Sequence, residues 1–198
     1  EEDPHRPRGA WQAAATSTLR NSSLAPILCH FRRRLQGLPM QTLIGRRAPR
    51  AIRVLQRISQ LVQPRVMSAY IRLVSGGFLV AQRFQQRRPC LFCNRFQDSI
   101  QHIGKCRVVW QCIRRASRLP RPAIGLEHDH LYCMTDGALD PGLLPQGTGQ
   151  TDVLSVRACL IYALYRTHNS LRLGGVHRLH VSGAFSEHFR EANVAHED

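Results

Sequence analysis

The sequence predicts a mainly α-helical fold, and two observations support this prediction. Apolar residues recur at three- and four-residue spacing after Pro49 and after Thr151, which is the period of a helix with one buried face. Prolines and pairs of glycines stand between these segments, where helices usually end. We therefore expect a small helical domain with long basic flexible arms and no internal repeat.

Six segments follow from this pattern along the 198 residues. Their expected bounds are a flexible arm at 1–24, a basic helical segment at 25–89, a cysteine-bearing turn with its following helix at 90–119, a loop at 120–150, a helix at 151–175 and a tail at 176–198. The arm and the tail show no clear period, and the loop is rich in Gly, Pro and Asp.

Within the second segment, one helix follows Pro49 and ends at Pro64. Its apolar positions are spaced by three and four residues from Ile52 onward. Another helix is expected over residues 66–86, with a break or kink at the Gly76–Gly77 pair because glycine weakens a helix interior. The sequence thus predicts short helices punctuated by prolines and glycines.

Two longer helices are expected further along the chain. One runs from about Ser99 to Leu119 and stops at the prolines that follow. The other begins with Thr151 or Asp152 as its N-cap and is closed by the Gly174–Gly175 pair. Its apolar positions mark a buried face, so this helix is expected to contribute to the core.

The charge of the chain is one-sided as well as high. The formal net charge is +15, and between Pro4 and Gln97 there are seventeen arginines and no acidic residue. A segment of one sign usually faces a polyanion, because each arginine that neutralises a phosphate releases a counterion. Nucleic acid is therefore the favoured partner, RNA slightly over DNA, with an acidic membrane surface or an acidic protein as alternatives.

The stretch CLFCNRFQDSIQHIGKC carries the pattern C-x2-C-x8-H-x3-C. Zinc prefers four tetrahedral ligands of imidazole nitrogen and thiolate sulfur, and a C-x2-C turn brings two thiolates onto one ion. The histidine and the last cysteine are four positions apart, so a helix capped by Asp98 or Ser99 would project both from one face. The predicted cofactor is one Zn²⁺, and its predicted ligands are Cys90, Cys93, His102 and Cys106.

Other groupings of cysteine and histidine are less regular. Cys112 and Cys159 are expected to be buried as small apolar side chains. Cys29 and His30 are adjacent and would rarely share one ion, and Cys133 lies with His128 and His130 in the expected loop, so neither grouping is favoured as a metal site. Four protein ligands leave no open position for a catalytic water, and no Gly-rich phosphate loop or other catalytic motif is present, so we expect no enzymatic activity.

The four ligand positions and the intervening DSIQH resemble the zinc knuckle near the C-terminus of non-LTR retrotransposon reverse transcriptases. The likeness extends to LVSGGFLVAQRFQQRRPCLFCN before the knuckle, and to CRVVWQCI and IYALYRTHNSLR after it, covering about residues 65–172. The paired aspartates of a polymerase are absent, as is the endonuclease motif of one branch of these elements. The resemblance implies the nucleic-acid-binding tail of such an enzyme, or a host protein built from one.

In this interpretation, arginines contact phosphates and an aromatic side chain stacks on an unpaired base or packs on the zinc ligands. The candidate residues are Arg83, Arg87, Arg88, Arg95, Phe92 and Phe96, together with the run Arg32, Arg33 and Arg34, which could equally be a solvated surface. The alternative function is a structural subunit of a large RNA-rich assembly such as an organellar ribosome, with the basic arms ordered by the partner.

The cysteines also bear on the compartment. Seven unevenly spaced cysteines do not form the framework of a secreted disulfide-rich domain, so we expect a reducing, intracellular location, with nucleus and organelle both open. No apolar run approaches the roughly 20 residues that a membrane span needs. The chain begins with Glu1, which suggests a processed product or a piece of a longer chain.

Overall fold

A computed structural model describes residues 48–74, 77, 78, 80–119 and 150–193. In this part of the chain the fold is mainly α-helical, as the sequence predicts, and the only β-type pairing is an isolated antiparallel bridge between Pro89 and Gln97. The elements are α3 (Ala48–Leu61), α4 (Pro64–Val74), the short 3-10 helix η1 (Ala81–Phe84), α5 (Ile100–Lys105), α6 (Arg107–Ser117), α8 (Gln150–Arg172), the 3-10 helix η4 (Arg178–His180) and α9 (Val181–Asn193).

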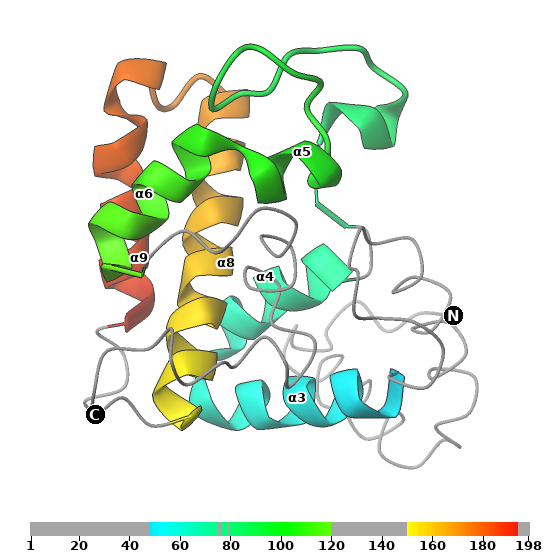
Figure 1. Ribbon diagram of the computed structural model, residues 1–198, viewed down its shortest axis with the longest axis vertical. Helices are drawn as coiled ribbons and strands as arrows, with labels where there is room; N and C mark the ends of the chain where they lie inside the picture. Colours follow the sequence, from blue (N-terminus) through cyan, green and yellow to red (C-terminus); the bar gives the residue numbers. More distant parts are fainter. Residues whose placement is uncertain (1–47, 75–76, 79, 120–149, 194–198) are drawn as a thin grey trace, which may run out of the picture.

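Helix α8 is the central element, and Figure 1 shows the other helices arranged around it. It contacts α9, α4, α3 and α6. A helix that is apolar nearly all round is buried on all sides, and α8 has this character from Val153 to Leu164. Helix α3 lies toward its N-terminal half and α4 beside its middle, while α5, α6 and the cysteine-bearing turn lie toward its C-terminal half (Figure 1).

Two arginines of α4 rest on tyrosines of α8. Arg72 donates a hydrogen bond from Nη1 to the Tyr165 hydroxyl at 2.7 Å, and its guanidinium lies 5.5 Å from the centre of that ring. The Arg65 guanidinium lies 5.9 Å from the centre of the Tyr162 ring. The interface between α4 and α8 buries apolar side chains such as Tyr70, and the two arginine contacts lie at its edges.

The predicted helix over residues 66–86 is shorter in the structure. Helix α4 already begins at Pro64, which suits the first position of a helix, and it ends at Val74. The backbone is non-helical at 77, 78 and 80 and is followed by η1, so the helix ends at the glycine pair instead of continuing with a kink. Phe78, fully buried beyond the break, packs edge-on against Tyr165 of α8 and ties the break to the core.

The C-terminus of α8 agrees with the prediction from Gly174 and Gly175. Gly174 has a φ of +76°, and its N–H donates to the Leu171 carbonyl. The Gly175 N–H donates to the Ser170 carbonyl at 2.8 Å. These two bonds form a Schellman motif, in which glycine takes the left-handed position without steric cost.

Residues 176–198 were expected as a tail, but residues 181–193 form α9, which packs along α8 (Figure 1). Its buried side chains are Val181, Phe185, Phe189 and Ala192, spaced by four, four and three residues as one helical face requires. The histidines and serines between them conceal this period in the sequence. Because α9 buries two phenylalanines, it is part of the core.

The expected arm at 1–24, the first part of the basic segment, the loop at 120–149 and residues 194–198 lie outside the described residues. The run Arg32, Arg33 and Arg34 lies there too. No helix in the described ranges is long and apolar enough to cross a membrane.

Candidate metal centre

The first two predicted ligands lie on a tight turn. The Cys90 N–H donates to the Phe96 carbonyl at 2.6 Å, and the Asn94 N–H donates to the Cys90 carbonyl at 2.8 Å, so the chain reverses direction over these residues. Asn94 has a φ of +57°, a left-handed conformation that asparagine tolerates better than most residues. The turn brings the side chains of Cys90 and Cys93 to the same side.

The other two ligands come from the junction of α5 and α6. Ser99 is the N-cap of α5, and its hydroxyl accepts a hydrogen bond from the His102 N–H at 3.1 Å. The cap therefore acts on the residue that carries the imidazole ligand. This outcome confirms one of the two predicted caps.

The single helix expected from Ser99 to Leu119 is two helices in the structure. Cys106 has φ −64° and ψ 119°, an extended conformation that ends α5 and caps the N-terminus of α6. Trp110 stabilises the junction by donating a hydrogen bond from Nε1 to the Gly104 carbonyl at 2.7 Å. Cys106 thus does not share a helical face with His102. Its sulfur is held at the N-terminus of α6, where the backbone N–H groups favour a thiolate.

The four predicted ligand side chains meet in space. The three sulfurs and the imidazole nitrogen all lie within 4.8 Å of one another. Cys93 Sγ and His102 Nε2 are 3.2 Å apart. Ligand atoms around tetrahedral zinc are about 3.5 to 3.8 Å apart, given bond lengths of about 2.0 to 2.3 Å. Three thiolates and one imidazole at these separations fit one zinc ion after shifts of a few tenths of an ångström to about one ångström.

The protonation of the group also suits a metal. The hydrogen bond with Cys106, followed by burial, raises the pKa of the Cys90 thiol, and the same hydrogen bond lowers the pKa of Cys106. Of the two thiols, Cys106 therefore ionises more readily, and metal binding would displace the protons that remain on the pair. Burial lowers the pKa of His102 more than the nearby Asp98 carboxylate raises it, so its imidazole is neutral at pH 7 and able to bind zinc.

Backbone N–H groups surround two of the sulfurs. Those of Cys93 and Phe92 lower the pKa of the Cys90 thiol, and those of Val109 and Val108 lower the pKa of the Cys106 thiol, because N–H groups near a sulfur stabilise its thiolate. N–H groups in such positions would also spread the charge of metal-bound thiolates.

A second contact, which the sequence analysis did not single out, anchors the turn to α8. The Asp98 carboxylate lies 3.1 and 3.2 Å from His168 Nε2, and both residues are buried. The carboxylate also accepts the Ala81 N–H at 2.9 Å. His168 continues the buried face of α8 one turn beyond Leu164, and Asp98 is the first acidic residue after Asp3. These two signals were available in the sequence.

The two aromatic candidates differ in exposure. Phe92 is buried and its ring centre lies 6.1 Å from that of His168, so it packs in the core instead of facing a ligand. Phe96 is 63% exposed, and its ring centre lies 5.0 Å from that of His102. Of the two, only Phe96 can meet a base without a rearrangement of the core.

The candidate arginines near the turn are at the surface. Arg87, Arg88 and Arg95 are exposed, whereas the side chain of Arg83 lies outside the description. Further exposed cations follow on α5, on α6 and directly after it, and the sequence analysis did not select them. They are Lys105, Arg107, Arg114, Arg115 and Arg118.

The remaining cysteines of the described residues are buried in the core. Cys112 and Cys159 are 1% and 0% exposed, as expected of small apolar side chains. Cys29, His30 and Cys133 lie outside the described residues. Comparisons with protein-family models, with curated proteins and with solved structures found no match to this chain. The residues of the candidate site are therefore the basis for any inference about its function.

Proposed function

We propose that this chain is a zinc-stabilised nucleic-acid-binding module that binds phosphates through arginine and performs no catalysis of its own. Its resemblance to the C-terminal tail of a retroelement reverse transcriptase supports the proposal. RNA is the favoured target.

One observation carries the proposal. Between residues 84 and 119, eight basic side chains are exposed, and the only carboxylate, Asp98, is buried. A segment that exposes cations and no anion of its own attracts a polyanion. The zinc ligands lie within the same stretch, so the metal would fix the backbone that presents several of these arginines.

The chemistry of the ligands supports a structural metal. All four zinc positions are filled by protein side chains, which leaves none for a reacting water. Zinc bound in this way contributes directly to folding, because it joins the turn at 90–97 to α5 and α6. The proposed module therefore loses its nucleic-acid affinity when the metal is removed.

The test is a salt titration of oligonucleotide binding with a matched control. Replacing Arg87 and Arg95 together by Gln should reduce the slope of log affinity against log salt by about 0.7 to 0.9 for each phosphate that is no longer neutralised. Arg190→Gln removes the same kind of charge from the exposed surface of α9 and should leave the slope nearly unchanged. A wild-type affinity that does not fall as salt rises from about 50 to about 200 mM contradicts the proposal.

Zinc dependence is tested in the same assay. Chelation should abolish binding, and adding zinc back should restore it. Persistent, unchanged binding by metal-free protein would show that the knuckle does not organise the binding surface.

A further inference from the structure

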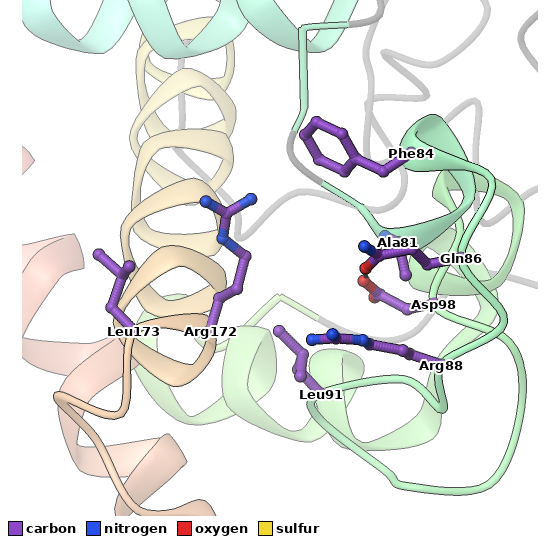
Figure 2. A pocket seen from close by; sticks show the side chains of 8 residues that line it. All are labelled: Ala81, Phe84, Gln86, Arg88, Leu91, Asp98, Arg172 and Leu173. Carbon is purple, nitrogen blue, oxygen red and sulfur yellow. Dashed lines mark hydrogen bonds between the residues drawn. The ribbon is translucent and has the colours of Figure 1, made fainter.

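A pocket lies between the zinc-binding turn and the C-terminal end of α8. Its cavity volume is about 400 Å³, within the range of roughly 300 to 1,000 Å³ that is usual for small-molecule sites. Figure 2 shows Arg172, the last residue of α8, on one side and six residues of the segment 81–98 on the other; Leu173, directly after α8, also belongs to the lining. Those six residues are Ala81, Phe84, Gln86, Arg88, Leu91 and Asp98.

Two guanidinium groups give the pocket a positive charge. Figure 2 shows Arg88 extending toward α8 just below Asp98, and Arg172 projecting from the end of α8. Among the described residues neither forms an ion pair with a carboxylate. The one carboxylate in the lining, Asp98, already accepts hydrogen bonds from Ala81 and from His168. The pocket is therefore suited to an anion with several acceptor oxygens, such as a phosphate.

Apart from Gln86, the rest of the lining is apolar and includes an aromatic ring. Phe84 is 47% exposed and Leu173 is 77% exposed, which is high for large apolar side chains. The Arg172 guanidinium lies 5.8 Å from the centre of the Phe84 ring, so a planar cation and an aromatic ring face each other across the pocket. Single-stranded nucleic acid is bound by this combination, in which bases stack on aromatic or guanidinium planes and phosphates contact cations.

We propose that this pocket binds one unpaired nucleotide of a single-stranded nucleic acid, with its phosphate on Arg88 and Arg172 and its base against Phe84. The proposal rests on the proposed function and names the ligand class of that surface. Exposed Arg87 and Arg95 lie on the same turn segment as the pocket wall, so neighbouring phosphates of a strand would find cations as well. A base inside a duplex is already stacked and cannot enter.

The test compares Arg172→Gln with Arg190→Gln, which removes an exposed arginine from another helix. The probe is an oligouridine of about ten nucleotides, alongside a duplex RNA of the same length. Arg172→Gln should weaken oligouridine binding roughly tenfold and change duplex binding no more than the control does. Zinc content and thermal unfolding are measured on both variants, so that a folding defect is recognised.

Phe84→Ala and photocrosslinking give an independent readout. An oligouridine with one photoreactive uracil should crosslink to Phe84 or to its neighbours in the pocket lining, and the crosslink should be lost in Phe84→Ala. Competition with uridine monophosphate separates a strand from a free nucleotide. Strong binding of the monophosphate with no added affinity for the strand would overturn the proposal in favour of a free nucleotide site.

The outcomes separate this proposal from the function on which it rests. If the wild type binds oligouridine in a zinc- and salt-dependent way but Arg172→Gln matches Arg190→Gln, the pocket proposal is wrong and the proposed function stands. If the wild type binds no nucleic acid, both are wrong.

Discussion

Asp98 and His168 are seventy residues apart in the sequence, yet the Asp98 carboxylate lies 3.1 Å from His168 Nε2 in the core. Their contact joins the turn that carries Cys90 and Cys93 to α8. A buried carboxylate and imidazole gain from pairing, and removing either one leaves the other uncompensated in a medium of low dielectric.

Asp98→Ala should therefore lower the free energy of unfolding by about 3 kcal/mol, because the His168 Nε2 and the Ala81 N–H both lose their acceptor. Urea unfolding of the zinc-bound protein measures this change. Glu191→Gln removes a carboxylate that lies 3.3 Å from His188 on the exposed surface of α9, and should cost less than about 0.5 kcal/mol. Equal effects of the two variants would show that the buried pair does not anchor the turn.

Ser99→Ala tests the N-cap of α5, the helix that carries the predicted zinc ligand His102. Loss of the hydroxyl acceptor of the His102 N–H should destabilise α5 by about 1 kcal/mol and weaken zinc binding by about fivefold. Competition with a metal indicator measures the affinity. Ser99→Asp should retain most of it, since aspartate caps helices as well. Ser59→Ala, on the exposed side of α3, is the matched control, and a loss of zinc affinity there as large as in Ser99→Ala would rule out the cap as the cause.

Two glycines with open space around the position of an added Cβ should respond in opposite directions. Gly174→Ala places a side chain at φ +76° in the Schellman motif and should cost about 1 kcal/mol. Gly183→Ala, in the first turn of α9, should raise the free energy of unfolding by a few tenths of a kcal/mol to about 1 kcal/mol, because alanine favours helix. Thermal or urea unfolding of both variants measures these changes in the free energy of unfolding. A Gly174→Ala protein that is more stable than the wild type would contradict the left-handed conformation at the end of α8.

Burial of Cys159 predicts a loss of stability in alkali. Burial raises the pKa of this thiol from 9.0 to about 11. As pH rises, the thiol therefore ionises in the unfolded chain before it ionises in the folded protein. The contribution of the protonated thiol to the free energy of unfolding is fully present below the unfolded pKa and is lost as pH rises through the folded pKa. Between about pH 8 and about pH 11 the loss attributable to this group should be roughly 2 kcal/mol. Urea unfolding of wild type and Cys159→Ala at both pH values measures it, and equal losses in the two proteins would contradict the assignment.

The sequence was most informative where one chemical requirement limits the spacing. Zinc needs four close ligands, so a C-x2-C turn followed by a capped helix predicted Cys90, Cys93, His102 and Cys106, and the structure brings these four together. The spacing did not reveal that the expected helix is interrupted at Cys106. The extended backbone there serves the N-terminus of α6 and the Trp110 contact, which depend on tertiary packing.

Long-range pairing and irregular helices were harder to predict. Asp98 and His168 meet only because α8 packs beside the turn, and no local spacing links them. Helix α9 has a regular buried face, but its polar residues and glycine dilute the apolar signal, so its formation depends on contact with α8. Packing against the rest of the fold also explains why the helix predicted over residues 66–86 is shorter in the structure. Phe78 lies beyond its end, in non-helical backbone, and is buried in the core.

Zinc content per chain, measured by elemental analysis on purified wild type and variants, bears directly on whether the fold is organised by a metal. The wild type should contain one zinc per chain, and Cys93→Ser and His102→Ala should lose it, because tetrahedral zinc needs all four ligands for tight binding. Cys112→Ser, at a buried cysteine outside the cluster, should keep one zinc per folded chain. A wild type with well under one zinc per chain that stays folded in chelator, or a Cys93→Ser protein that retains its zinc, would contradict the metal centre described above.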